Sequence, residues 1–325
     1  MKKHLFNFFA VVATALTVMV LGEVLLRVKH NDQMSYPVEM WRYAKQLKTL
    51  VTDPKLGHVH IPNSLAELQN VSISINSLGM RGPEPPVSDP ENLRILLLGS
   101  SITLGWGVAE GKILRALLQE QLGGKTEVLN AGVGNYNAER YVTLYSKRLQ
   151  KLDPDIIIVH YFVNDAEILP PPAGNWFMRN SQMALMLWQA MVNLTVGRDD
   201  LKGLEAHYRE VYAESSEGRK RMHTALLELD QLAQASGARV ILAMMPDIHN
   251  LSPYPFGFVH KHMRGFAEHL DWTFVDLLEG FKDVEDPHTL FAIPGDPHPN
   301  ARGHAIMANV LAPVLERMIA SKIDK

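Results

Sequence analysis

The amino-acid sequence predicts a three-layer α/β/α sandwich with a mainly parallel sheet, preceded by one membrane-spanning helix. Three observations lead to this prediction: an uncharged apolar stretch near the N-terminus, short apolar runs typical of buried strands, and helical periodicity between those runs. Of the 325 residues, 46% are hydrophobic and 21% are charged. This composition excludes disordered, collagen-like and coiled-coil chains.

Charge and cysteine content narrow the classes of function. The formal net charge is -3, so no strong positive field is present to attract nucleic acid, and we expect no nucleic-acid partner. The chain contains no cysteine, which excludes disulfide frameworks, thiolate metal sites and cysteine nucleophiles.

The first segment, residues 1–29, is predicted to be a membrane anchor. No charged residue lies between Leu5 and Gly22, and about 17–25 apolar residues suffice to cross a bilayer. The end of the stretch lacks a small-x-small cleavage pattern, which favours an uncleaved anchor over a signal peptide. Basic residues flank both ends, so only the free amino terminus orients the helix, and we expect the rest of the chain to be periplasmic or otherwise extracytoplasmic.

Residues 30–89 contain scattered proline, asparagine and glycine without a long periodic run. This pattern predicts a connecting stalk that leads into the edge of the domain. Regular alternation then begins and defines one domain over residues 90–325.

Strands and helices alternate through this domain. Short apolar runs predict strands at 95–98, 128–129, 156–159, 240–244 and 273–276. Apolar residues at helical spacing predict helices at 113–122, 138–149 and 216–235, and a last helix begins at about Ala301 after an Asn300 N-cap. Such alternation indicates crossover connections and therefore a parallel sheet covered on both faces.

An insertion around residues 170–202 interrupts this alternation. Its segment 183–194 is an unusually apolar helix candidate. A lid, an acyl-chain groove or a membrane-facing patch would explain it, and so would a buried core helix.

Polar residues follow several strands, at the sheet edge where sites of parallel α/β domains collect. Ser100 and Ser101 follow the first strand, and Asn164 follows the third. A serine hydroxyl becomes nucleophilic when a base takes its proton and donors stabilise the oxyanion. Asp296 and His298 are two residues apart, so in an extended segment they share a side and the carboxylate can orient the imidazole.

Other assignments stay open at this point. Asp165 or Asp286, instead of Asp296, would also be able to approach His298. The two glycine-rich turns, 99–105 and 132–135, match neither a P-loop nor a dinucleotide fingerprint.

The order of these motifs resembles the SGNH, or GDSL, hydrolase superfamily over about residues 76–312. The matching segments are a lead-in at 76–84, the nucleophile block at 98–108, a second block at 130–136, a third at 163–165 and a last block at 296–300. The resemblance implies a flavodoxin-like SGNH hydrolase fold. It implies Ser101 as nucleophile, His298 as base and Asp296 as its orienting acid. It also implies an oxyanion hole made by the Ser101 and Asn135 backbone N–H groups and the Asn164 side chain.

The sequence departs from the family pattern in four places. Ser100 stands where an aspartate is usual, and Asn135 and Phe162 stand where glycines are usual. One residue, rather than two, separates Asp296 from His298. Related polysaccharide O-acetyltransferases share this shorter spacing.

The resemblance implies a serine-dependent ester hydrolase, a carboxylesterase or deacetylase, that forms an acyl-enzyme on Ser101 without cofactor or metal. An acylated glycan or lipid is the expected substrate. One alternative is an O-acyltransferase that moves acetyl groups to an envelope glycan, and another is a non-catalytic anchored binding module. A metal hydrolase is a third alternative, because five candidate ligands crowd one region: Asp286, His288, Asp296, His298 and His304.

Overall fold

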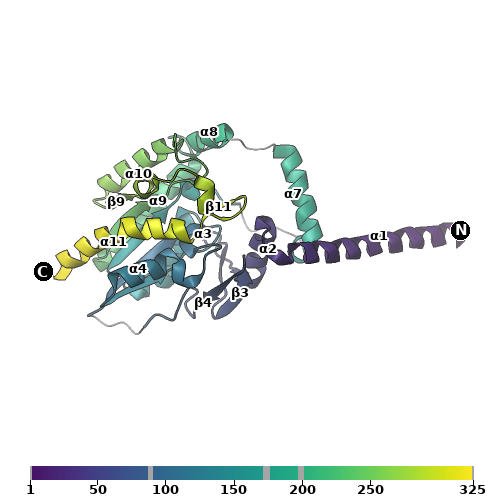
Figure 1. The fold of residues 1–325 in the computed structure, drawn as a ribbon, viewed down its shortest axis with the longest axis horizontal. Helices are drawn as coiled ribbons and strands as arrows, with labels where there is room; N and C mark the ends of the chain where they lie inside the picture. The colour runs from purple at the N-terminus through teal and green to yellow at the C-terminus, as the bar shows by residue number, and fades with distance from the viewer. Residues whose placement is uncertain (1, 87–90, 171–175, 197–200, 324–325) are drawn as a thin grey trace.

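The computed structural model describes residues 2–86, 91–170, 176–196 and 201–323. Its centre is a five-stranded sheet in the order β6-β5-β7-β8-β9, in which all neighbouring strands are parallel (Figure 1). The strands are β5 (Leu93–Gly99), β6 (Thr126–Asn130), β7 (Ile156–Tyr161), β8 (Arg239–Met244) and β9 (Thr273–Asp276).

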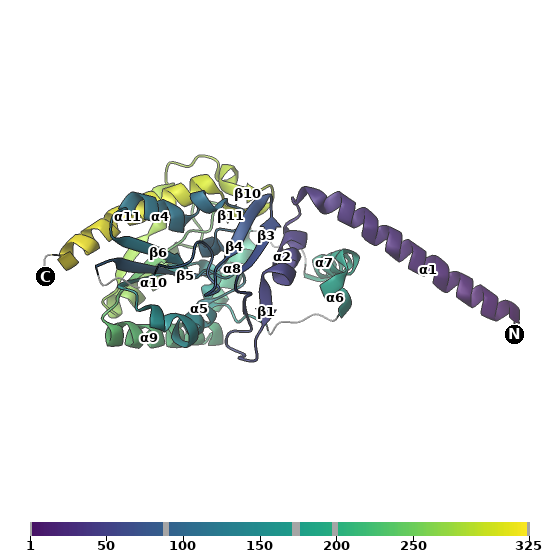
Figure 2. The ribbon, with the colours of Figure 1, turned by 90° about the horizontal axis from the view of Figure 1, so that it is seen from below.

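Helices cover both faces of this sheet (Figure 2). One face packs on α4 (Leu114–Leu122) and α11 (Ala301–Ile323), and the other packs on α5 (Ala138–Leu144), α9 (Glu217–Ser236) and α10 (Gly257–His269). Successive residues of β5 enter opposite cores, because side chains alternate along a strand. Double burial explains the apolar runs of the three central strands, β5, β7 and β8, and the two helical layers confirm the predicted three-layer fold.

The predicted elements agree with the structure within a few residues, with one difference. The helix expected at 138–149 ends at Leu144 and continues as a single π turn, Tyr145–Leu149. The described 3-10 turns are His30–Asp32, Glu110–Lys112, Gln150–Leu152, Val163–Ala166, Leu277–Phe281 and Pro287–Leu290.

The structure differs from the expected stalk. The segment contains α2 (Tyr36–Gln46), a hairpin of β1 (Lys48–Leu50) and β2 (His58–His60), and a hairpin of β3 (Ser64–Leu68) and β4 (Val71–Ile75). We call residues 36–75 the N-terminal lobe. Its apolar side chains form a small core with Leu104 and Trp106 of the α/β domain.

A turn without glycine concealed the second hairpin. Gln69 and Asn70 both have positive φ, 51° and 58°, as the central residues of a tight hairpin require. Glycine usually marks such a turn in a sequence, and its absence here removes the signal.

The N-terminal helix α1 (Lys2–Lys29) projects away from the domain (Figure 2). Lys3–Asp32 is long and apolar enough to cross a membrane, with a mean hydropathy of 2.3 in its most apolar window, and none of that window is buried. No other helix among the described residues meets these criteria.

The insertion after β7 carries α6 (Trp176–Asn180), α7 (Gln182–Val196) and α8 (Leu201–Val211). Leu187, Trp188 and Met191 of α7 are 65%, 51% and 49% exposed. The interpretation of this segment as a buried core helix is therefore wrong.

Candidate active site

Ser101 lies at the carboxyl end of β5 and is the first residue of the short helix α3 (Ser101–Leu104). The turn before it requires glycine, since a Cβ on Gly99 would lie 2.0 Å from Oγ1 of Thr103 and 2.9 Å from the carbonyl oxygen of His160. The first N–H groups of a helical turn have no partner within the helix, so the Ser101 N–H is available to a ligand.

A hairpin near the C-terminus brings Asp296 and His298 to this serine. It consists of β10 (Phe291–Ile293) and β11 (Asp296–Pro299). Nε2 of His298 lies 2.8 Å from Oγ of Ser101, and Nδ1 of His298 lies 2.5 Å from Oδ1 of Asp296. The three side chains form one hydrogen-bonded chain, although the serine and the histidine are 197 residues apart.

The other two carboxylates considered for His298 have different partners. Asp165 is buried and accepts the backbone N–H of Phe162 at 3.1 Å, which closes the turn after β7. Asp286 accepts the backbone N–H of His288 at 3.0 Å.

The N-terminal lobe and the nucleophile block hold the other oxygen of Asp296. Oδ2 accepts hydrogen bonds from Nε2 of Gln69 at 2.9 Å and from Nε1 of Trp106 at 3.1 Å. Burial raises the pKa of Asp296, but the hydrogen bonds from His298 and Gln69 outweigh burial, so the pKa lies below its ordinary value. The carboxylate therefore stays ionised beside the imidazole.

Gln69→Ala is expected to shift the acid unfolding of the protein to higher pH. The lowered pKa of Asp296 stabilises the fold above the unfolded-state pKa of about 3.9, and this contribution disappears as pH falls through the folded-state pKa. Without the Gln69 donor, the folded-state pKa of Asp296 is higher. The stabilisation by this carboxylate therefore begins to disappear at a higher pH. Denaturant midpoints measured across acidic pH test this, with the exposed Gln121→Ala as control, and an unchanged pH dependence would contradict it.

Asn135 and Asn164 line the same pocket as Ser101 and His298, and the pocket has a volume of about 260 Å³. Asn135 has a φ of 64°, a left-handed conformation that asparagine tolerates better than most residues. Asn164 lies in the turn Val163–Ala166 directly after β7. Phe162 also lines the pocket, where a glycine is usual in similar sequences.

The N-terminal lobe holds both peptide groups that flank Gly134, and the second of them carries the Asn135 N–H. The Gly134 N–H donates to the Tyr43 hydroxyl at 2.8 Å, and the Gly134 carbonyl lies 3.0 Å from Nε2 of His58 and 3.4 Å from Nζ of Lys48. Burial, then the charge of Lys48, lowers the pKa of His58 to about 3, so a neutral ring donates through Nε2. The N–H of a trans peptide points opposite its carbonyl, so these donors aim the Asn135 N–H away from Lys48 and His58.

Tyr43→Phe is expected to lower kcat more than it raises KM. It leaves the Gly134 N–H and Nε2 of His60 without the hydroxyl that both contact, and each unsatisfied buried group costs about 1–3 kcal/mol of stability. Steady-state kinetics and thermal unfolding measure the two effects. Tyr145→Phe, at a buried tyrosine outside the pocket, is the control. Wild-type kcat in Tyr43→Phe would show that the Gly134 peptide needs no such support.

Arg81 of the lead-in holds the loop that follows Ser101 and α3. Its buried guanidinium donates to the carbonyls of Leu104, Gly105 and Val108 at 2.6–3.0 Å and pairs with Glu110. The lead-in therefore supports the carboxyl end of α3.

A second Asp-His pair lines the pocket, and the sequence analysis missed it. Asp247 follows β8 and accepts both the backbone N–H of His249, at 2.9 Å, and its Nδ1, at 2.7 Å. The same Asp-x-His spacing occurs at Asp296 and His298, so this repetition was a signal that the sequence contained.

The candidate metal ligands do not gather into a site. Within the described ranges, no group of three or more histidine, aspartate or glutamate side chains is arranged to hold a metal ion. His304 is fully buried, and its Nδ1 accepts the backbone N–H of Leu114 at 3.0 Å. His288 is exposed beside Phe291.

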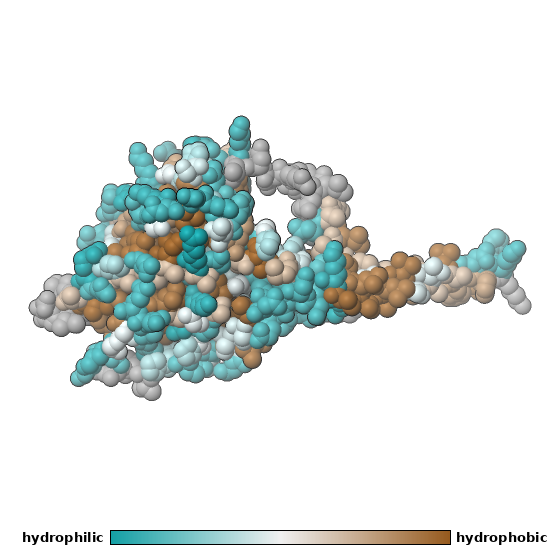
Figure 3. All heavy atoms as spheres, in the orientation of Figure 1, coloured by the Kyte–Doolittle hydropathy of each residue, from teal (hydrophilic) through white to brown (hydrophobic). Residues whose placement is uncertain are grey.

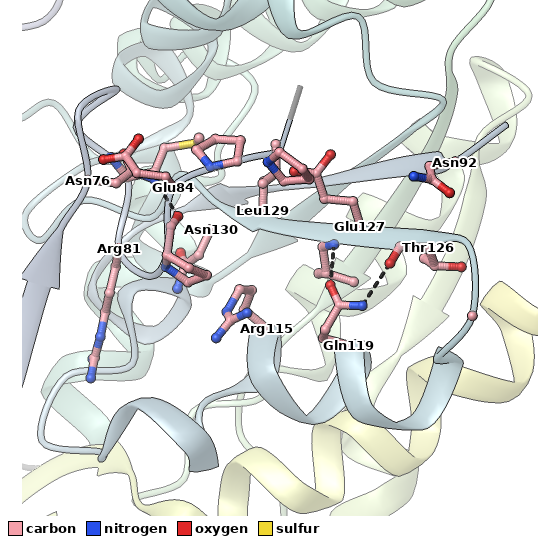
Figure 4. A pocket seen from close by; sticks show the side chains of 16 residues that line it. Asn76, Arg81, Glu84, Asn92, Arg115, Gln119, Thr126, Glu127, Leu129 and Asn130 are labelled. Carbon is pink, nitrogen blue, oxygen red and sulfur yellow. Dashed lines mark hydrogen bonds between the residues drawn. The ribbon is translucent and has the colours of Figure 1, made fainter. Parts of the chain in front are cut away.

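A second cavity, of about 220 Å³, lies between the lead-in and α4 (Figure 4). Gln119 crosses from α4 to the backbone of Thr126 and Val128, and Arg115 pairs with Glu110. Ser101, Asp296 and His298 do not line this cavity, so it is separate from the pocket at Ser101.

Comparison with known proteins finds one family. The model of the GDSL-like lipase/acylhydrolase family matches residues 97–306, and no curated protein sequence matches the chain. Similar solved structures include TesA, at 18% identity over 69% of this chain and 98% of that chain, with a TM-score of 0.44. They also include a member of the lipolytic protein G-D-S-L family from Veillonella parvula DSM 2008, at 16% identity over 69% and 99% of the chains, with a TM-score of 0.43. A catalytic mutant of Axe2, an acetylxylan esterase from Geobacillus stearothermophilus, has 16% identity over 70% and 94% and a TM-score of 0.43.

The family match covers more than half of the chain and includes the nucleophile block, the turn that carries Asn164, and the hairpin of Asp296 and His298. The protein therefore belongs to the GDSL-like lipase/acylhydrolase family and is a hydrolase that acts on ester bonds.

Proposed function

We propose that the protein is a membrane-anchored serine esterase, a carboxylesterase or deacetylase, that forms an acyl-enzyme on Ser101. The observation that supports this most strongly is the hydrogen-bonded chain Ser101, His298 and Asp296 at the pocket, with distances of 2.8 and 2.5 Å. This is the arrangement of nucleophile, base and orienting acid that acyl transfer requires.

In the proposed reaction, Oγ of Ser101 attacks the ester carbonyl carbon while Nε2 of His298 takes the hydroxyl proton. Asp296 accepts from Nδ1 and stabilises the imidazolium that forms. The tetrahedral intermediate then collapses, and His298 returns the proton to the departing alcohol. Water, activated by the same histidine, releases the acid and restores Ser101.

Three donors would stabilise the negative oxygen of the intermediate: the backbone N–H groups of Ser101 and Asn135 and the side-chain amide of Asn164. The support for this assignment is that all three residues line the pocket and that hydrogen bonds from the lobe hold the Gly134 peptide. Donors fixed before the reaction stabilise the oxyanion without a cost of reorganisation.

The size of the pocket favours an ester with a small acyl group. Its volume of about 260 Å³ is below the roughly 300–1,000 Å³ typical of drug-sized ligands. Apolar side chains, Met40, Phe162, Leu169 and Leu204, contribute to its wall. An acetyl ester of an envelope glycan or lipid fits this size, and α1 would keep the enzyme at the membrane with its domain on the extracytoplasmic side.

Labelling of the full-length chain in detergent with a fluorophosphonate serine probe tests the proposal. Wild type is expected to be labelled, Ser101→Ala is not, and Ser100→Ala, which changes the adjacent serine of the same turn, should keep labelling. Label retained in Ser101→Ala, or absent from a folded wild type that is also inactive on acetyl esters, would overturn the proposal. If labelling follows the prediction, product analysis with added sugar acceptors then separates hydrolysis from transfer.

A further inference from the structure

The helix α7 is attached to α1 where α1 leaves its apolar stretch. Glu23 of α1 accepts from Oγ of Ser181 at 2.8 Å and from the backbone N–H groups of Gln182 and Met183 at 3.1 and 3.0 Å. A carboxylate at a helix N-terminus satisfies N–H groups that otherwise lack a partner and complements the helix dipole. α7 therefore begins at a fixed height along α1.

Further contacts hold this junction. Arg27 pairs with Glu23 and donates to the carbonyl of Asn180, and Nε1 of Trp41 donates to the carbonyl of Met178. A Cβ on Gly22 would lie 3.0 Å from Sδ of Met183, so the two helices approach closely there.

α7 begins beside α1 and runs steeply away from it toward α8 (Figure 1). Its sequence contains no charged residue. Leu187, Trp188 and Met191 lie on one side at helical spacing and are half to two-thirds exposed. Apolar side chains cover both α1 and the part of α7 next to it (Figure 3).

We propose that α7 lies in the membrane interface and inserts Leu187, Trp188 and Met191 among the lipids. This inference depends on the proposed anchoring through α1. If α1 crosses the bilayer, a helix that leaves α1 steeply at Glu23 lies close to the membrane plane. An exposed apolar face containing tryptophan is suited to that depth.

The absence of cysteine permits a direct depth measurement. Leu187→Cys, labelled with an environment-sensitive fluorophore in the full chain and reconstituted in vesicles, is expected to lie roughly 5–10 Å into the headgroup and acyl boundary by depth-dependent lipid quenching. Val12→Cys in α1 reports the anchor, and Leu65→Cys, exposed on β3, is the aqueous control.

Lipid quenching at positions 12, 187 and 65 tests the inference. Deep quenching at residue 12 with shallow quenching at 187 and none at 65 supports it. Quenching at 12 without quenching at 187 overturns the inference and leaves the anchor intact. No quenching at 12 refutes the anchor and the inference together, while esterase activity remains a separate result.

The second Asp-His pair supports a separate inference about the substrate of the same pocket, and this inference rests on the proposed function. Asp247 is 5% exposed and fixes His249 through two hydrogen bonds. In the neutral ring, Nδ1 donates to the carboxylate, which leaves Nε2 as an acceptor. The side chain of His249 is 40% exposed and lines the pocket of Ser101.

We infer that Nε2 of His249 accepts a hydrogen bond from a hydroxyl group in the alcohol part of the ester. His249→Ala should then lower kcat/KM about 10-fold for an acetylated sugar and leave p-nitrophenyl acetate unaffected, since the latter has no such hydroxyl. His249→Gln, which keeps an acceptor, should restore part of the loss. Equal losses on both esters would overturn the inference, and a wild type inactive on both would refute the proposed function instead.

Discussion

His298→Ala is expected to lower kcat for an acetyl ester by at least roughly 10³-fold and to leave the fold intact. The variant removes the group 2.8 Å from Oγ of Ser101, and an alcohol without a base remains protonated at neutral pH. Ser101→Ala should cost about as much, and the double variant little more, because the residues act as one unit. Initial rates and far-UV circular dichroism measure the two properties.

His288→Ala is the matched control for this prediction. His288 is exposed and has a different carboxylate neighbour, Asp286, so its loss should leave kcat near the wild-type value. Near-normal turnover in His298→Ala would refute the assignment of the base. An equal loss in His288→Ala would instead favour the metal-hydrolase alternative, in which His288 is a candidate ligand.

Asn164→Ala is expected to lower kcat by about 10²- to 10³-fold with little change in KM. An oxyanion donor interacts with charge that develops in the transition state, so its removal affects the chemical step more than substrate binding. Steady-state kinetics on a short acetyl ester measure the split. Asn164→Asp should be worse than alanine, because a carboxylate would face the developing negative charge.

Asn180→Ala is the control for Asn164→Ala, since Asn180 lies in α6 and does not line the pocket. A loss that appears in KM alone would show that Asn164 binds the ground state. No loss at all would leave the two backbone N–H groups as the donors.

The sheet was predictable because the burial of each central strand leaves a pattern in that strand's own sequence. β7 reads as a continuous apolar run since both of its faces are buried, and β5 ends at a glycine that sterics require. The order of polar residues after the strands then placed Ser101 and Asn164 at one edge. The roles of Asp296 and His298 followed from resemblance to a family, and periodicity alone would not have assigned them.

The N-terminal lobe was not predictable for equally physical reasons. Its strands are three to five residues long, and the β3–β4 turn carries positive φ at Gln69 and Asn70 without a glycine. The contact between Gln69 and Asp296 spans 227 positions, so no local pattern reports it. The exposed apolar side of α7 was undetermined because periodicity cannot show whether lipid, protein or water covers a face.

The N-terminal lobe lies outside the segment that matches the family model. Tyr43 and Gln69 nevertheless contact Gly134 and Asp296 inside that segment. A chain cut to begin at Leu93 would keep every strand of the sheet and lose the partners of Gly134 and Asp296. The smallest unit that preserves the geometry of the pocket thus begins near Tyr36, which itself lines the pocket wall. The N-terminal lobe therefore belongs to the functional unit of this chain together with the segment that the family shares.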